Sequence, residues 1–283
     1  MTAPGLLPLL YEDVVRRSLL EDLGRAGDVT TDAIVRADLA GRAVVVARSG
    51  GRVAGLDPAL HAFRLLDPDG RIDVRLGDGS DVAKGDVIAR VTASARALLA
   101  AERTALNLLG HLSGIATVTR DVVALLEGLP TRVAGTRKTT PGLRALEKHA
   151  VRVGGGSSHR YGLDDAVLVK DNHVALAGGI AEAVRRVRHG VGHLVKVEVE
   201  VDTLAQLEEA LATGVDAVLL DNMDPTTLRE AVRRARGKAL TEASGGIRPE
   251  NVREIAETGV DLVSLGWLTH SAPALDVALD IEV

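Results

Sequence analysis

The 283-residue chain has no cysteine, and only 1% of its residues are aromatic. Without cysteine, it has no disulfide, no thiolate ligand for a metal ion and no cysteine nucleophile. Nucleic-acid platforms combine clustered cations with stacking aromatic rings. A net charge of -5, without a basic tail, and four aromatic side chains do not suit that task. The composition therefore argues against a nucleic-acid partner.

The sequence also lacks recognisable targeting and membrane segments. Its first eight residues have neither the basic start nor the long apolar stretch of a signal peptide, and no apolar run stands out as a membrane span. Hydrophobic residues make up 46% of the chain and charged residues 26%, so Ala, Val and Leu must fill the core. We expect a soluble, cytoplasmic, globular protein with no membrane partner.

The second half of the chain repeats a strand, a polar tip and an amphipathic helix every 22 to 29 residues. This alternation is typical of a right-handed βα array, whose chemistry lies at the carboxyl ends of the strands. The expected strands are 131–135, 166–170, 195–201, 217–221, 239–243 and 262–265. A full barrel has eight strands, so six predict an α/β fold with an open, incomplete barrel.

The first part of the chain predicts an N-terminal α+β sandwich domain. A helix over 9–22 and short strands within 41–91, with one helix near 58–66, precede a long helix over 94–127. In that long helix, Gly110 and Gly114 mark a break or a close packing contact. The expected division is a sandwich domain over 1–112, a barrel over 113–270 and, over 271–283, a C-terminal helix that packs back on the sandwich.

Strand 195–201 alternates valine with charge, so Lys196, Glu198 and Glu200 share one face. Both faces of a barrel strand are covered, which predicts a buried Lys196–Glu198 pair and leaves Glu200, nearest the carboxyl end, for a ligand or metal ion. An edge strand with a wet face is the alternative.

The next strand ends in Asp221, so Glu200 and Asp221 could share an oxygen-ligand site suited to Mg²⁺. Asp221 could instead cap the following helix, although Asp224 before Pro225 is the better cap.

Small residues follow the last two strands. Backbone N–H groups at such tips often bind phosphate in barrels, although a plain αβ turn would have the same composition. The candidate phosphate ligands are Ser244, Gly245, Gly246, Ser264 and Gly266.

Cations crowd the remaining strand tips of this otherwise acidic chain. The candidates are Arg137 and Lys138, with Thr139 beside them, then His159 and Arg160, and then Lys170. Solvated surface charge is the usual role of lysine and arginine, but apolar strands place these residues at ordered tips. A mixed Arg, Lys and His set fits a small polycarboxylate beside a polyphosphate. The other histidines lack such neighbours and are interpreted as structural or surface residues.

The segment 74–91 has the outline of a biotinyl or lipoyl carrier hairpin. It lacks the tight turn on which the carrier lysine of those modules stands, so Lys84 is predicted to be an exposed turn residue.

Several motifs closely resemble the quinolinate phosphoribosyltransferase family, which is the nicotinate-nucleotide pyrophosphorylase (carboxylating) family of NAD synthesis. They are GTRKTTPGLR (135–144), GGGSSHRYGLDDAVLVKDNH (154–173), VEVEVD (197–202), LLDNM (219–223), EASGGI (242–247) and ALDVAL (274–279). The resemblance runs from the first helix to the C-terminus. It implies that quinolinate and 5-phosphoribosyl-1-diphosphate (PRPP) react with Mg²⁺ present, giving nicotinate mononucleotide, CO₂ and diphosphate.

The resemblance also implies roles for individual residues. Cationic side chains would hold the quinolinate carboxylates and the diphosphate, and the acids would face the ribose and Mg²⁺. The expected catalytic residues are Lys138, Lys170, Glu200 and Asp221, of which Glu200 and Asp221 are also the expected metal ligands. The expected substrate-binding residues add Arg103, Arg137, Thr139, His159, Arg160, Ser244, Gly245, Gly246, Ser264 and Gly266. Arg103 matches an arginine that family members lend to the neighbouring subunit, which implies a homodimer with shared active sites or a higher oligomer of such dimers.

Three rival interpretations remain. The molybdenum-locus paralogue of the same family would share these motifs. A Schiff-base lyase on a phosphate-binding barrel would use Lys170 or Lys138 as its nucleophile. A non-catalytic carrier would be modified on Lys84.

Overall fold

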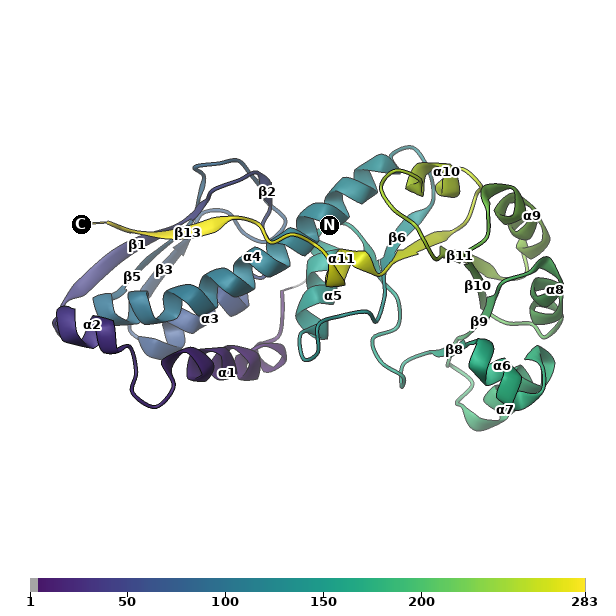
Figure 1. Cartoon of the computed structure of the whole chain (residues 1–283), viewed down its shortest axis with the longest axis horizontal. Helices are drawn as coiled ribbons and strands as arrows, with labels where there is room; N and C mark the ends of the chain where they lie inside the picture. Colours follow the sequence, from purple (N-terminus) through teal and green to yellow (C-terminus); the bar gives the residue numbers. More distant parts are fainter. Residues whose placement is uncertain (1–4, 283) are drawn as a thin grey trace. The chain divides into compact units, whose positions relative to one another are not determined.

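The structure, a computed structural model, describes residues 5–282 (Figure 1). The chain forms two compact units. The first comprises the residues up to 120, residues 139–155 and the residues from 268; the second comprises 121–138 and 156–267. The predicted boundaries, 112/113 and 270/271, lie near the changes at 120/121 and 267/268, but 139–155 belongs to the first unit.

The first unit contains an antiparallel sheet in the order β13-β1-β5-β3 and a small β2-β4 pair. Its elements are the 3₁₀ helix η1 (Pro8–Leu10), α1 (Glu12–Leu23), α2 (Val29–Ile34), β1 (Ala40–Ala47), β2 (Gly51–Arg52), α3 (Leu56–Leu66), β3 (Arg71–Val74), β4 (Asp81–Val82), β5 (Val87–Ser94), most of α4 (Ala95–Leu125), α5 (Arg144–Val153) and β13 (Val277–Glu282). Sheet and helices share one core, in which Phe63 of α3 and Ile88 of β5 are buried. The predicted N-terminal sandwich is therefore confirmed, and Lys84, after β4, is exposed as expected.

Helix α4 is the central helix of this core. By length and composition it could cross a membrane, contrary to the expectation that no apolar run is long enough. Its side chains Leu98, Leu112 and Ile115 are each 0% exposed within the first unit. Their burial accounts for the apolar composition of α4, because a helix that is covered on most sides needs no polar face.

The C-terminal segment is a strand, so the predicted helix over 271–283 is wrong. Strand β13 pairs antiparallel with β1 in a register that joins Arg42 to Glu282 and Ala47 to Val277. The segment does return to the first unit, as expected. Its conformation depends on the free edge of β1, which lies far away in sequence and which no local pattern reveals.

Two glycines let this returning chain approach α4 closely. A Cβ atom on Gly114 would lie 2.1 Å from the Pro273 carbonyl oxygen, and one on Gly110 would lie 2.9 Å from that of Leu275. The carbonyl of Gly110 also accepts a hydrogen bond from the Leu275 N–H at 2.9 Å. Of the two predicted meanings of these glycines, close packing is confirmed.

The second unit is built on seven parallel strands in the order β7-β6-β12-β11-β10-β9-β8. The strands are β6 (Arg132–Gly135), β7 (Ser157–Ser158), β8 (Val167–Val169), β9 (Val197–Val201), β10 (Ala217–Asp221), β11 (Leu240–Ser244) and β12 (Leu262–Leu265). The predicted open α/β barrel is confirmed, with all six expected strands and the short β7 in addition. The first and last long strands, β6 and β12, are neighbours.

Helices cover the outer face of this sheet (Figure 1). They are α6 (Asp171–Ala177), α7 (Ile180–Gly190), α8 (Leu204–Ala212), α9 (Pro225–Ala235) and α10 (Val252–Ala256), and α11 (Trp267–His270) follows β12. Side-chain caps start two of them after a strand tip. Thr203 and Gln206 form a capping box on α8, and Asp224 accepts from the N–H groups of Thr226 and Thr227. Asp224 is thus the cap of α9, as predicted.

The valines of β9 are buried, with Val199 0% exposed, and Glu198 on the opposite face is also buried. The predicted Lys196–Glu198 pair is wrong. Lys196 precedes β9, is exposed, and pairs with Asp216 at 2.5 Å. The strand begins at Val197, two residues later than expected, so Lys196 lies outside it.

We predict that Gly114→Ala will lower the free energy of unfolding by about 1–3 kcal/mol, since the added methyl group must displace the backbone near Pro273. Chemical denaturation monitored by circular dichroism measures the change. Gly77→Ala in the same unit is the control, because nothing lies within 4 Å of the added atom. Equal stability of the two variants would contradict the close-packing role.

Candidate active site

The predicted cations of the second unit follow three strands at their carboxyl ends. Arg137 and Lys138 follow β6, His159 and Arg160 follow β7, and Lys170 follows β8 directly. All three strands run parallel within one sheet, so these residues lie at the same edge. Cationic residues therefore follow the strands at both sides of the strand order, β7 and β6 on one side and β8 on the other.

Arg137 and Arg160 are close enough to influence each other. Burial lowers the pKa of Arg160 from its usual value, and the positive charge of Arg137 lowers it further. Glu198 and Asp165 act in the opposite direction. Two partly buried guanidinium groups that repel each other form a place where an anion, above all a carboxylate, is stabilised.

Acids and a lysine converge at the tips of β8, β9 and β10. The Lys170 Nζ lies 2.5 Å from Glu200 Oε2. The pKa of Asp221 is raised, first by burial and then by the negative charges of Glu200 and Asp202. Glu200 and Asp221 lie on adjacent strands and are close enough for the charge of one to affect the other.

Asn222 connects the tips of β10 and β11. It is the only non-glycine with a positive φ, 53°, among residues 5–282. Its N–H donates to the Ser244 carbonyl at 2.9 Å, and its amide donates to Asp221 Oδ2 at 2.7 Å. This unusual backbone conformation lets one side chain orient Asp221.

The predicted phosphate ligands lie beside Asn222. Gly245 and Gly246 adopt φ values of 88° and 62°, and a Cβ atom on Gly245 would lie 2.2 Å from Asn222 Oδ1. Trp267 Nε1 donates to the Ile247 carbonyl at 3.0 Å, which ties the end of β12, with Ser264 and Gly266, to the loop after β11. Glycine is favoured at 245 and 246 because both have a positive φ, and at 245 also because a side chain would collide with Asn222.

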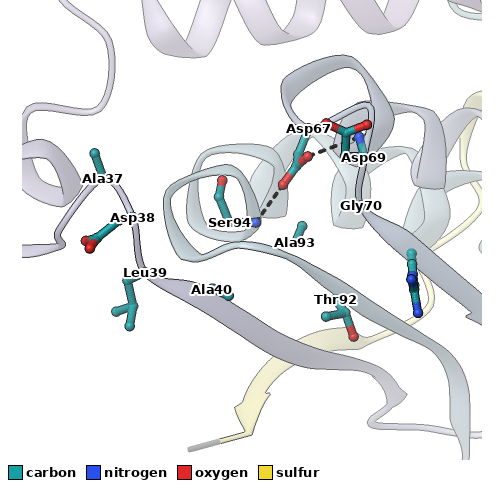
Figure 2. Close-up of a pocket in the computed structure, with 11 residues that line it drawn as sticks. Ala37, Asp38, Leu39, Ala40, Asp67, Asp69, Gly70, Thr92, Ala93 and Ser94 are labelled. Atoms are coloured by element: carbon teal, nitrogen blue, oxygen red, sulfur yellow. Dashed lines mark hydrogen bonds between the residues drawn. The ribbon is translucent and has the colours of Figure 1, made fainter.

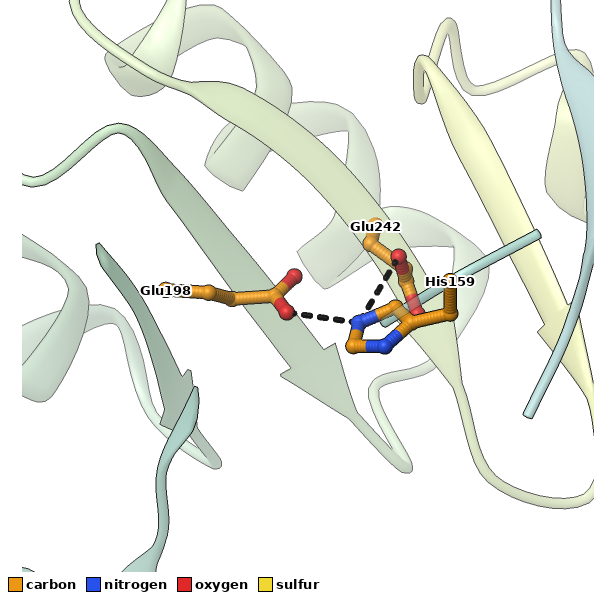
Figure 3. Close-up of side chains that lie close together, drawn as sticks. All are labelled: His159, Glu198 and Glu242. Carbon is orange, nitrogen blue, oxygen red and sulfur yellow. Dashed lines mark hydrogen bonds and ion pairs between the residues drawn. The ribbon is translucent and has the colours of Figure 1, made fainter. Parts of the chain in front are cut away.

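His159 meets two buried glutamates in the barrel interior (Figure 3). Its Nε2 lies 2.8 Å from Glu198 Oε2 and 3.7 Å from Glu242 Oε2. The glutamates belong to β9 and β11, the neighbours of β10.

Two groups of residues could hold a metal ion. His159, Glu198 and Glu242 are the only group of three or more such ligands whose atoms converge, within 4.8 Å, in the part of the chain that the structure describes. Glu200 and Asp221 form an oxygen-only pair, and their mutual repulsion fits a divalent cation with oxygen ligands.

Arg103 and Thr139 belong to the first unit, so the contacts within the barrel do not include them. The Arg103 side chain on α4 is 64% exposed. It lines a cavity of about 510 Å³ within the first unit, together with Asn107, His111 and Thr140. His111 Nε2 bonds the buried Glu147 at 2.8 Å and His149 Nε2 bonds Asp78 at 2.8 Å, which agrees with the structural roles predicted for them.

A second hollow of the first unit is acidic (Figure 2). Asp38, Asp67 and Asp69 line it. The Asp67 carboxylate already accepts hydrogen bonds from the N–H groups of Ser94, at 2.7 Å, and Asp69, at 3.2 Å. These hydrogen bonds give the Asp67 carboxylate a structural role in the turn, so its position needs no bound metal ion or substrate to account for it.

Two residues of this site had no predicted role. Glu242 lies within a short apolar strand, where a single acid gives no signal of its partner. Asn222 follows Asp221 directly. The available hint was its residue type, because asparagine tolerates the left-handed backbone conformation that it adopts here.

Both units match known protein families. Residues 28–113 match the N-terminal domain of quinolinate phosphoribosyl transferase, and residues 115–280 match its C-terminal domain. The N-terminal match lies in the sandwich and the C-terminal match contains every barrel strand.

Relatives match over nearly the whole length. The chain is 46% identical over 274 residues to the nicotinate-nucleotide pyrophosphorylase [carboxylating] of Mycobacterium leprae, with 95% of this chain and 96% of the relative covered. It is 44% identical over 275 residues to a probable enzyme of the same name from Bacillus subtilis, with 97% and 94% covered. The solved structure of the nicotinate-nucleotide pyrophosphorylase from Francisella tularensis superposes with a TM-score of 0.94 at 38% identity, covering 100% of this chain and 99% of that one.

The raised pKa of Asp221 makes a prediction about stability. The folded protein favours the protonated carboxyl, so ionisation costs stability above the folded pKa, and this cost is absent below the unfolded value of about 3.9. We predict that Asp221→Asn will increase the free energy of unfolding at pH 7.5, by less than about 1 kcal/mol because the group is partly exposed. The gain should shrink as the pH falls through the folded pKa toward the unfolded value of about 3.9, as measured by urea denaturation.

Asp224→Asn is the control of opposite sign. Hydrogen bonds from the side chain and N–H of Thr227 lower the pKa of Asp224, so this substitution should reduce stability at pH 7.5. A loss of stability in both variants would contradict the strained environment of Asp221.

Proposed function

Because the chain belongs to the quinolinate phosphoribosyltransferase family, we propose that it transfers the phosphoribosyl group of PRPP to quinolinate with loss of CO₂. The products are nicotinate mononucleotide, CO₂ and diphosphate, and the enzyme is a pentosyltransferase of NAD biosynthesis. One observation carries the assignment to this site. The parallel strands bring groups suited to a dicarboxylate, a phosphate, a ribose and a diphosphate to one edge of the sheet.

The cationic end of this edge suits the dicarboxylate. Strands β7 and β6 are adjacent and carry His159, Arg160, Arg137 and Lys138. Arginine binds carboxylate through two parallel N–H groups, which fixes both position and orientation. We assign quinolinate to these residues; Thr139, the next residue after Lys138, remains a candidate from the sequence motif.

The middle of the edge suits a phosphate and a ribose. Strands β12 and β11 end in Ser264, Gly266 and the Ser244–Gly246 turn, where backbone N–H groups can bind the 5-phosphate. The next strands, β10 and β9, carry Asp221 and Glu200. Their carboxylates would stabilise the positive charge that develops at C1 of the ribose as diphosphate leaves.

Lys170 on β8 completes the edge and would neutralise the leaving diphosphate. Mg²⁺ would be held by PRPP together with Glu200 and Asp221, and when bound it would supply further charge neutralisation to the diphosphate. No covalent nucleophile is required. The quinolinate nitrogen attacks C1 as diphosphate leaves, and the cationic pyridinium ring stabilises the carbanion that the departing CO₂ leaves behind; that ring carbon then takes up a proton from solvent.

The rival chemistries lack such support. A Schiff-base lyase needs a lysine amine that is free to attack its substrate, whereas Lys170 Nζ is already in contact with Glu200 Oε2 at 2.5 Å. Lys84 stands on an exposed turn without the carrier motif. An assay distinguishes the molybdenum-locus paralogue: under the proposed function, CO₂ is released from quinolinate only when PRPP is present. If no CO₂ is released with both substrates present, the proposed function is rejected.

We further propose a cytoplasmic homodimer. Arg103 is exposed on α4 and matches the family arginine that enters the neighbouring subunit's site. A reaction between two soluble metabolites suits the cytoplasm.

We predict that Arg160→Ala will weaken quinolinate binding by roughly 2 to 5 kcal/mol, because a bidentate partner is lost from a partly desolvated site. Arg160→Lys should be intermediate, since it keeps the charge but not the fork. Isothermal titration calorimetry measures the affinity. Arg236→Ala, on an exposed loop before β11, is the control and should bind normally. Unchanged affinity in Arg160→Ala would overturn the assignment of the dicarboxylate to β6 and β7.

A mixing experiment tests the shared site. Arg103→Ala and Lys170→Ala homodimers should each be nearly inactive. After subunit exchange about half of the dimers are heterodimers with one intact site of two, so roughly a quarter of wild-type activity should return. Native mass spectrometry confirms the exchange, and no recovery after confirmed exchange would show that Arg103 does not complete the partner's site.

A further inference from the structure

Three strands converge on the imidazole of His159 (Figure 3). The main chain of His159 is held to β6 by a hydrogen bond from its N–H to the Gly135 carbonyl at 3.3 Å. Glu198 on β9 and Glu242 on β11 approach the same ring nitrogen, Nε2, at 2.8 and 3.7 Å. The main-chain hydrogen bond and the two glutamates together hold the residue and its ring in place.

Glu242 is level with Glu200 along the strands, and Glu198 lies farther from the strand tips. Leu219 of β10 pairs with Glu200 on one side and with Glu242 on the other, so these two acids are level. Glu198 lies two residues before Glu200, farther from the strand tip. Glu198 is 8% exposed and Glu242 3%, which places them out of reach of most ligands.

Such burial is a poor source of stability. A buried carboxylate must be paired, and replacing a buried ionic group by apolar residues is often neutral or stabilising. The surrounding strands are rich in valine and leucine, and these would fill the same space at lower cost. The charged trio therefore needs an explanation other than packing.

We propose that Glu198 and Glu242 are positioning residues that hold His159 by Nε2 and thereby set how His159 meets the quinolinate carboxylates. This inference rests on the proposed function for the identity of the ligand. An ionised carboxylate only accepts hydrogen bonds, so the trio requires hydrogen on Nε2. Glu198, at the shorter distance, supplies the hydrogen bond, and Glu242 supports it with its charge.

A double-mutant cycle tests whether Glu198 acts through His159. Glu198→Met keeps the length of the side chain but removes the acceptor, and should raise the KM for quinolinate at least about tenfold while the KM for PRPP changes less than about twofold. Glu198→Gln retains an acceptor oxygen and should stay within about threefold of wild type. In a His159→Ala background, Glu198→Met should have no further effect. An equal effect in both backgrounds would show that Glu198 acts independently of His159.

A measurement on the unmodified, ligand-free protein keeps the inference testable if a variant does not fold. Nitrogen-15 NMR of the imidazole, assigned through the spectrum of His159→Ala, should show hydrogen on Nε2. Nε2 without hydrogen would overturn the inference, and so would metal analysis that finds one ion per chain bound by the trio. If wild-type protein fails to convert quinolinate and PRPP, the proposed function is wrong, while the NMR result still decides whether the glutamates hold Nε2.

Discussion

The parallel hydrogen bonding of seven strands is the constraint on which the site depends. Because every strand of the second unit runs in the same direction, every strand ends at the same edge. Residues that are up to about a hundred positions apart, such as Arg137 and Gly246, therefore lie at one edge although the strands before them, β6 and β11, are not paired with each other. The helices on the outer face complete the crossovers from β8 to β12, and caps such as Asp224 fix where a helix begins after a strand tip.

Along this edge the cationic and the acidic side chains are grouped on different strands. The cations of β6 and β7 stand at one end, the glycine-rich tips of β12 and β11 follow, and the acids of β10 and β9 lead to Lys170 on β8. At two places a partly buried group lies near like charges: burial first, and the like charge second, lower the pKa of Arg160 and raise that of Asp221. Sites tolerate the cost of such an arrangement where a ligand of opposite charge removes it.

The first unit contributes through its packing. Gly110 and Gly114 let the returning chain lie against α4, and β13 then covers the edge of β1. With β13 in place, β1 lies inside the sheet and β13 is its edge strand. The same helix carries Arg103 on its exposed side, so the core of the sandwich also fixes the base of the residue proposed to serve a partner.

The sequence by itself determined the fold class, the six long barrel strands and the residues at their tips, since apolar periodicity and turn residues are local signals. Motif resemblance added their roles. Tertiary structure alone decided that β6 lies beside β12, that Val277–Glu282 form a strand, and that Glu198 pairs with His159 instead of Lys196. Each of these depends on partners far away along the chain. The physical reason is that a strand edge or a buried carboxylate is satisfied by whichever group the fold brings near, and a local sequence pattern does not record which group that is.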